Sequence, residues 1–193
     1  DTNGNVSSET AVVTVQDTIA AVVITQDITI QLDANGDASI DTTMIDNGSN
    51  DACGIASQVL DITTFDCSNI GENTVTLTIK DNNGNVSEKE VVVTVQDIII
   101  PLLVGVPANM DASCDAVPDV INPTASDNCA GNSEVHYLGE VRTNGASNND
   151  YTLTRTWDAT DVSGNHSLVG TQVITVEDTT NPTIIASGNI SSN

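Results

Sequence analysis

One stretch decides the fold: Thr74-Val-Thr-Leu-Thr-Ile-Lys80, then Asp81-Asn-Asn-Gly-Asn85, then Val91-Val-Val-Thr-Val-Gln96. The first segment places valine, leucine and isoleucine on one face and threonines on the other. This period of two is typical of a half-buried β-strand. Asn-Gly between two such runs is a strong hairpin signal, because both central positions of a type I′ turn need positive φ. The stretch therefore predicts an antiparallel hairpin.

The turn of this hairpin recurs every 80 residues, as Asp1-Thr-Asn-Gly-Asn5, Asp81-Asn-Asn-Gly-Asn85 and Asp161-Val-Ser-Gly-Asn165. A second phrase keeps step with it, in Val13-Thr-Val-Gln-Asp17, Val93-Thr-Val-Gln-Asp97 and Ile174-Thr-Val-Glu-Asp178. Two phrases in step indicate a tandem array of structural units. The chain starts and ends inside a unit, so we expect it to be a segment of a longer protein.

Alternating Val and Thr elsewhere in the chain predict an all-β protein, with helix only in short turns. In the first full unit we expect strands near 21–25, 28–32, 38–45, 55–62, 74–80 and 87–96. Several short strands per unit, separated by Asn, Gly, Asp and Pro, predict tandem immunoglobulin-like antiparallel β-sandwiches.

The second phrase sets the domain boundaries. Residues 1–17 are expected to be the last strand of a preceding repeat, 18–97 and 98–178 to be complete repeats, and 179–193 to be the first strand of a following repeat. Pro101 and Pro182 follow the second and third closing Asp after three residues, whereas Ala21 stands at the first junction. Proline favours a stiff, extended connection, so an elongated rod is expected.

Composition excludes several partners. The chain has 27 acidic and only 4 basic residues, so it lacks the clustered Lys and Arg that bind nucleic acid or anionic lipid. No apolar run approaches the roughly 20 residues that span a bilayer, so direct membrane insertion is not expected. Aromatic residues make up 2% of the chain, and the core must be built from small aliphatic side chains.

The four cysteines allow three pairings. Cys53 with Cys67 and Cys114 with Cys129 are favoured, because each pair closes a loop of about 15 residues inside one repeat, a bridge worth about 3 kcal/mol. Disulfides indicate an extracellular or periplasmic location.

No enzyme is expected. The sequence has no nucleophile elbow, no Ser-His-Asp or Cys-His set and no glycine-rich phosphate loop. Zinc is disfavoured too, because there is no Cys-x-x-Cys and because His136 and His166 have no partner at ligand spacing.

The acidic residues predict calcium sites at the junctions. Residues 87–96 span roughly 33 Å as a strand, so Asp81 and Asp97 should lie at opposite ends of one unit, with the Asp81 loop facing Asp17. Carboxylates that converge without cations repel one another, and Ca²⁺ takes six to eight such oxygens. The candidate ligands are Asp17, Asp46, Asp51, Asp81, Asn83 and Asn85 at the first junction, and Asp97, Asp127, Asp161 and Asn165 at the second.

A simpler reading makes each Asp-x-x-Gly-Asn only a turn. We expect this of Asp33-Ala-Asn-Gly-Asp37. The phrase is not an EF-hand, because Val92 stands at the twelfth position after Asp81, where a Glu is required. Asp1 and Asp178 are expected to be half-sites.

The sequence also carries a family resemblance. Asp51-Ala-Cys-Gly54 and Phe65-Asp-Cys-Ser68, followed by the hairpin above, resemble the hyalin-type (HYR-like) immunoglobulin repeats of giant surface adhesins from gliding bacteria. The second unit resembles a sister subtype through Val106-Pro-Ala-Asn109, Ser126-Asp-Asn-Cys129 and Tyr151-Thr-Leu-Thr-Arg-Thr-Trp157. The resemblance implies secretion to the cell surface, stabilisation by calcium and disulfides, and a role in adhesion, gliding motility or biofilm attachment.

The second unit departs from this resemblance in one respect. Ser147 and Ser163 stand where such repeats often carry a further cysteine pair, so this unit should be the softer one. The expected function is a structural stalk whose partners are neighbouring repeats. Two alternatives stay open: a filament subunit that exchanges its terminal strands, 6–16 and 179–190, with other copies, and a module that binds glycans or proteins.

Overall fold

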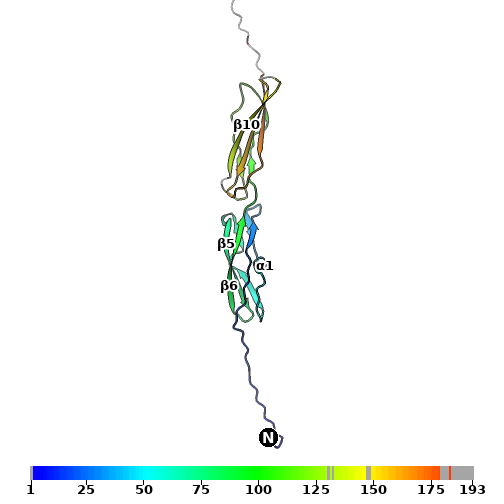
Figure 1. Ribbon diagram of the computed structural model, residues 1–193, viewed down its shortest axis with the longest axis vertical. Coiled ribbons are helices and arrows are strands. Elements are labelled where there is room, and N and C mark those ends of the chain that lie inside the picture. Colours follow the sequence, from blue (N-terminus) through cyan, green and yellow to red (C-terminus); the bar gives the residue numbers. More distant parts are fainter. Residues whose placement is uncertain (1, 130, 132, 147–148, 179–182, 184–193) are drawn as a thin grey trace, which may run out of the picture. The chain divides into compact units, whose positions relative to one another are not determined.

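The computed structural model describes residues 2–129, 131, 133–146, 149–178 and 183. It divides into two compact units, Asp1–Asp97 and Ile98–Asn193 (Figure 1). Both units are built from β-strands, so the all-β fold of tandem β-sandwich modules is confirmed. The expectations for Asp1, for Ser147 and, apart from residue 183, for the strand at 179–190 lie outside the described residues.

The first unit contains a four-stranded sheet and a two-stranded sheet. The larger sheet has the order β1-β6-β5-β3, from Ile28–Gln31, Val86–Gln96, Gly71–Asp81 and Ile55–Leu60. Strand β1 runs parallel to β6, whereas β5 is antiparallel to both of its neighbours. The smaller sheet pairs β2 (Asp37–Ser39) with β4 (Thr64–Asp66).

The hairpin predicted from the sequence forms the centre of this unit. β5 and β6 pair from Gly71↔Val95 to Lys80↔Val86, and Figure 1 shows them side by side. The alternating residues Val75, Leu77 and Ile79 are fully buried, and the β6 valines at 91, 93 and 95 bury the matching face. The period of two in the sequence is therefore confirmed.

Three details differ from the expected strands. The segment expected as a strand at 38–45 ends in a short helix, α1 (Thr42–Ile45), because the Asp41 carboxylate caps it by accepting bonds from the backbone N–H groups of Thr43 and Met44. Residues 21–25 contribute only isolated bridges, at Val22 and Thr25. Strand β4 and the following 3₁₀ turn, Cys67–Asn69, were not predicted.

The second unit repeats the plan. Its strands are β7 (Leu102–Val104), β8 (Met110–Ser113), β9 (Thr124–Ser126), β10 (Glu134–Asn144), β11 (Tyr151–Thr160) and β12 (Gly170–Glu177). The larger sheet has the order β10-β11-β12-β8, and β7 pairs with β9 in the smaller one. As in the first unit, the first strand of the larger sheet runs parallel to the last, here β8 beside β12.

The core of the second unit includes a buried cation. Arg155 is 4% exposed. Its guanidinium donates to Glu140 Oε2 at 2.8 Å and to the backbone carbonyls of Pro118 and Asp119. These bonds satisfy the charge where an unpaired cation would be costly. Beside it, buried Trp157 donates its indole N–H to Asn122 Oδ1 at 3.0 Å.

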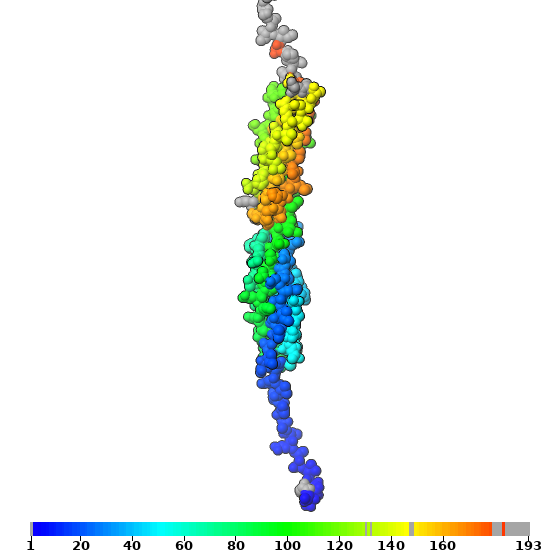
Figure 2. Space-filling model, viewed as in Figure 1, coloured from blue at the N-terminus to red at the C-terminus, as the bar shows by residue number. Residues whose placement is uncertain are grey.

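The leading segment of the first unit joins no sheet among the described residues. Residues 5–16 form no strand, and Val12, Val13 and Val15 are 94%, 82% and 88% exposed. Figure 2 shows this segment, in dark blue, extending away from the packed part of its unit. Among the described residues, no helix has the length and apolar character needed to cross a bilayer.

Candidate functional site

The Asp81–Asn85 turn is built around one carboxylate. Asp81 is 1% exposed. Its Oδ1 accepts the backbone N–H groups of Asn83 (2.9 Å) and Asn85 (2.8 Å), and its Oδ2 accepts the Asn85 side-chain amide at 2.7 Å. Gly84 supplies the positive φ of 97° that closes the turn. The carboxylate thus holds its own loop in shape.

Asn85 also holds the chain that enters the unit. Its Nδ2 donates to the backbone carbonyls of Asp17 and Ile19, each at 3.3 Å, besides Asp81 Oδ2. Ser87 continues the contact, because its hydroxyl donates to the carbonyl of Ala21 at 2.8 Å. We call this arrangement around the Asn85 amide the entry clamp. It places the Asp17 carboxylate beside the hairpin turn.

A second loop brings further ligands to the same end of the unit. Asp17, Asp51 and Cys53 each place one ligand atom within 4.8 Å of the others. Asp51 Oδ1 accepts the backbone N–H of Cys53 at 2.8 Å. Asp17 Oδ1 accepts the backbone N–H of Ile19 at 3.0 Å, whereas its Oδ2 is buried and accepts no N–H or O–H group. A buried carboxylate oxygen in that state is a natural cation ligand.

The Asp51 loop is fastened to the hairpin turn by Asn82. Its side-chain amide donates to the carbonyl of Cys53 at 2.8 Å, and its backbone N–H donates to the carbonyl of Gly54 at 3.1 Å. Gly54 has a φ of 92°, and a Cβ there would lie 2.8 Å from Asn82 Nδ2. The positive φ therefore favours glycine at this position, and a side chain there would also displace the Asn82 amide from the Cys53 carbonyl.

The electrostatics of the site favour a cation. A hydrogen bond to the Asp17 carboxylate and repulsion by its charge raise the pKa of the Cys53 thiol, and Asp51 and Asp81 add to the repulsion. Among the described residues of the first unit, neither Lys80 nor Lys89 forms a salt bridge that would offset these charges. Negative charge therefore accumulates where the loops meet.

Asp81 itself stays ionised. Burial raises the pKa of its carboxyl, but the bonds from the Asn85 side chain and from the backbone N–H groups of the turn outweigh this effect and place the pKa below 3.8. The charged form is the one that the turn is built to hold.

The donor set fits a hard cation in part. Carboxylate oxygens of Asp17 and Asp51 are the ligands that Ca²⁺ prefers, and backbone carbonyls and water complete such sites. The sulfur of Cys53 is a soft ligand and does not belong to that set. A calcium ion here would therefore be bound through the two carboxylates and not through the thiol.

The structure gathers only part of the predicted ligand set. Asp17 and Asp51 come together beside the Asp81–Asn85 turn. Asp46 is engaged elsewhere, since its carboxylate accepts the backbone N–H of Ser49 at 3.0 Å and the side-chain amide of Gln58 at 3.4 Å. Asn83 contributes its backbone N–H to the turn. Cys53 was not predicted as a neighbour of Asp17, although its position two residues after Asp51 is a usable signal.

The second unit repeats the clamp with the same residue types. Asp161 accepts the backbone N–H groups of Ser163 (2.9 Å) and Asn165 (2.8 Å) and the Asn165 amide (2.9 Å). That amide also donates to the carbonyl of Ile99 at 3.2 Å, as Asn85 does to Ile19. Cys129 donates its backbone N–H to Asp127 Oδ2 at 3.2 Å, as Cys53 does to Asp51.

The calcium site expected at the second junction combines these residues with Asp97, which belongs to the first unit. It stays a prediction, as do the half-sites at Asp1 and Asp178.

The turn at residues 33–37 has the same backbone hydrogen bonds to its aspartate as the clamp turns, but it lacks the side-chain amide that binds the entering chain. Asp33 Oδ1 accepts the N–H groups of Asn35 (2.8 Å) and Asp37 (3.0 Å), and Gly36 has a φ of 81°. Asp37 stands where the other turns have asparagine, so it has no amide to donate to an entering chain.

The expected disulfide pairs are wrong. Cys53 and Cys114 are exposed free thiols, whereas Cys67 and Cys129 are disulfide-bonded. In the first unit, strand β3 separates Cys53 from Cys67 and its six residues cover about 20 Å, far beyond the 4.4–6.8 Å that joins the Cα atoms of a disulfide. A short spacing along the chain is thus not a short distance in space when a strand lies between.

The second unit separates its cysteines in the same way. Cys114 follows Ser113, which pairs with Glu177 at the end of β12. Gly131, two residues after Cys129, lies against Val162, beyond the end of β11 that pairs with the start of β12.

No protein-family model and no curated protein sequence matches the chain. Among solved structures, human protocadherin-24 EC1-2 is 13% identical with a TM-score of 0.38, over 84% of this chain and 100% of that one. Drosophila N-cadherin EC1-4 is 14% identical with a TM-score of 0.34, over 77% and 49%. The fibronectin(III)-like modules of Clostridium thermocellum CbhA are 12% identical with a TM-score of 0.29, over 87% and 100%.

The bonds to Asp81 make the first unit sensitive to acid. Because its folded pKa is depressed, Asp81 contributes stability above pH 3.8 that is lost as pH falls through the lower folded value. We expect Asp81→Asn to lower Tm at pH 7 and the gap from wild type to narrow below pH 3.8. Asn83→Ala, which keeps the backbone N–H used by the turn, is the control. An equal Tm gap at pH 7 and pH 3 would contradict this role for the Asp81 charge.

The cysteine assignment predicts a specific labelling pattern. Iodoacetamide added to the native protein, followed by unfolding, should modify Cys53 and Cys114 without reductant, and Cys67 and Cys129 only after reduction. Peptide mass spectrometry reads the four sites separately. Recovery of a peptide linked through Cys53 and Cys67 would show that the pairing expected from spacing was right after all.

Proposed function

We propose that this chain is a calcium-stabilised stalk or spacer segment of a long cell-surface adhesin of the hyalin-repeat (HYR-like) type. The observation that supports it is the repetition of the entry clamp: Asn85 and Asn165 make equivalent bonds to a turn aspartate and to an entering carbonyl, 80 residues apart. A set of contacts that recurs in each unit is expected of a structural feature of the tandem repeats, and not of a single catalytic site.

The polar groups at these ends have structural duties. Both carboxylate oxygens of Asp81 and of Asp161 accept hydrogen bonds within their own turns. The Arg155 guanidinium is bound by Glu140 and two backbone carbonyls. None of these groups is poised to accept a proton from a substrate, which requires a free lone pair facing an open site. We infer a non-enzymatic role.

Calcium would reinforce the link that the Val22↔Asn50 bridge already makes between the entering segment and the loop before β3. Bound by the carboxylates of Asp17 and Asp51, it would hold these two side chains together and remove their mutual repulsion. Extracellular modules of this kind typically bind calcium with Kd values of about 10⁻⁴–10⁻³ M. The disulfide-bonded state of Cys67 and Cys129 also supports an extracellular location.

Calcium should therefore stabilise the first unit through two carboxylates. At free Ca²⁺ about 100 times its Kd, the free energy of unfolding should rise by about 2.7 kcal/mol, which corresponds to a Tm increase of about 10 °C or more. Calorimetry in Ca²⁺ and in chelator measures the increment, and Asp17→Asn or Asp51→Asn should abolish most of it.

Asp37→Asn is the matched control, because it removes an exposed carboxylate in the same unit from the turn that has no clamp. Its calcium increment should equal that of wild type. A Tm that does not change on chelation would contradict the calcium part of the proposal. A calcium-dependent increase in Tm that persists in Asp17→Asn would show that the ion binds elsewhere.

One observation favours a second role, in a filament. Residues 5–17 match 85–97 at nine of thirteen positions, yet their valines are exposed where those of β6 are buried. Such a segment has the sequence of a sheet strand, and within the described part of the chain it pairs with no strand. Pairing with another copy of the chain would bury it.

Strand exchange between copies predicts concentration-dependent association. Light scattering of the full chain should show a mass that rises with concentration, and deletion of residues 1–16 should leave a monomer. Val13→Lys with Val15→Lys is the point-substitution version, because charges on that face oppose burial. A full chain that stays monomeric at high concentration would leave only the stalk role.

A further inference from the structure

We propose that Cys53 and Cys114 are the two halves of an intermolecular disulfide, in which Cys114 of one copy of the chain bonds to Cys53 of another. Both are exposed free thiols, whereas Cys67 and Cys129 are disulfide-bonded. A thiol left over in an extracellular protein with disulfides indicates pairing with another molecule. The proposal goes beyond the stalk and filament roles, because the bond requires neither calcium nor strand exchange.

The first unit carries one cysteine at each of its ends. Cys53 lies beside Asp17, at the end where the entry clamp holds the chain. Cys67 lies at the opposite end, because its Sγ is 3.7 Å from the carbonyl oxygen of Gly36, in the turn that follows β1. Strands β1 and β6 both end there. Cys53 therefore marks the end where the chain enters the unit, and Cys67 marks the end where the chain leaves it.

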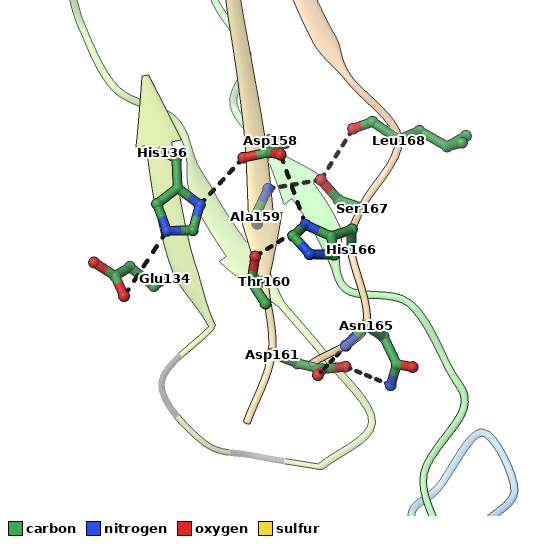
Figure 3. Close-up of polar contacts among 10 residues, drawn as sticks. All are labelled: Glu134, His136, Asp158, Ala159, Thr160, Asp161, Asn165, His166, Ser167 and Leu168. Carbon is green, nitrogen blue, oxygen red and sulfur yellow. Dashed lines mark hydrogen bonds and ion pairs between the residues drawn. The ribbon is translucent and has the colours of Figure 1, made fainter. Parts of the chain in front are cut away.

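The second unit has the same two positions. Cys129 is followed two residues later by a glycine that lies against Val162, inside the Asp161–Asn165 turn. Figure 3 shows Asn165 bound to Asp161 in this turn, at the end where the chain enters the unit. Cys114 lies at the opposite end, directly after the residue that pairs with Glu177 at the end of β12.

The oxidation states follow these positions. The two bonded cysteines lie where the chain leaves the first unit and where it enters the second. The two free cysteines lie where the chain enters the first unit and where it leaves the second. Each state thus comprises one entry cysteine and one exit cysteine. Two copies in head-to-tail order supply the same combination, and a head-to-tail contact that does not close on itself builds an open chain of copies.

The entry position has the local structure of a disulfide half. Cys129 is bonded and 4% exposed, and its backbone N–H donates to Asp127 Oδ2 at 3.2 Å. Cys53 donates in the same way to Asp51 Oδ1 at 2.8 Å, yet its side chain is exposed and its thiol is free. The same loop conformation therefore presents a bonded, covered sulfur in one unit and an uncovered thiol in the other.

The oxidant of the proposed step is a low-molecular-weight disulfide, such as oxidised glutathione. The Cys114 thiolate attacks one of its sulfurs and releases a glutathione thiolate. The Cys53 thiolate of another copy then attacks the mixed disulfide and releases the second glutathione thiolate. Two electrons pass to the oxidant, and the two thiol protons end on the two released thiolates. The carboxylates that raise the pKa of Cys53 also make it a slow leaving group, so the bond, once formed, resists exchange.

The test uses the untagged full chain, with Cys53 and Cys114 free, in chelator and oxidised glutathione. A pH of about 8.5 supplies thiolate, and salt of about 0.15 M screens the repulsion between acidic chains. After alkylation of the remaining thiols, a denaturing gel without reductant should show dimers, trimers and longer species that reductant removes. Mass spectrometry of the dimer should recover a peptide linked through Cys53 and Cys114.

The matched variants are Cys53→Ser and Cys114→Ser, whose Tm values verify folding. Each alone should lose the dimer and all longer species, whereas an equimolar mixture of the two should restore the dimer and nothing longer. Dimers of either single variant at the level of the mixture would overturn the proposal, because exposed thiols would then react without preference. A chain that stays monomeric, or a linked peptide found only in the monomer, would overturn it too. The denaturing gel records only covalent links, so these outcomes leave the calcium and strand-exchange proposals untouched.

Discussion

One side-chain amide connects the parts of each unit. Asn85 has two N–H groups and serves three acceptors: the buried Asp81 carboxylate and the carbonyls of Asp17 and Ile19. Hydrophobic burial shapes the β5–β6 hairpin, but it does not decide where the entering chain is held. Polar contacts decide this: the amide binds the carbonyls of Asp17 and Ile19, the Ser87 hydroxyl binds that of Ala21, and Val22 bridges to Asn50. Without the amide, a buried carboxylate oxygen of Asp81 would also lose a donor. The position of Asp17 depends on these contacts, whereas the Asp51 loop is held by Asn82.

Much of the fold could be predicted because two local signals agree in this sequence. The alternation from Thr74 to Lys80 specifies which face is buried, and the Asn-Gly turn specifies where the chain reverses. The failures come where a single polar side chain overrides such a pattern. Asp41 caps a helical turn inside a segment whose sequence predicts a strand, and the alternating pattern of the segment does not indicate that turn.

The sites were harder to predict because they depend on register. Counting strand lengths placed the Asp81 loop opposite Asp17, and the expected sandwich topology placed the Asp51 loop at the same end; the structure brings Asp17 and Asp51 together. Asp46 could not be placed in this way, since its role in a local turn depends on Ser49 and Gln58. The histidines are the clearest case: His136 stands 22 positions before Asp158, and only the pairing of β10 with β11 brings the two together. The cysteine pairs failed for the converse reason, because β3 carries the chain away from Cys53.

The raised pKa of Cys53 affects the reactivity of its thiol. Only the thiolate attacks disulfides and electrophiles, so the neighbouring carboxylates keep an exposed sulfur chemically slow. A cation bound between Asp17 and Asp51 would cancel most of that repulsion and restore the nucleophile. If calcium binds Asp17 and Asp51 as proposed, Cys53 would therefore react faster in its presence, and the rate of alkylation of Cys53 would report whether the two carboxylates hold an ion.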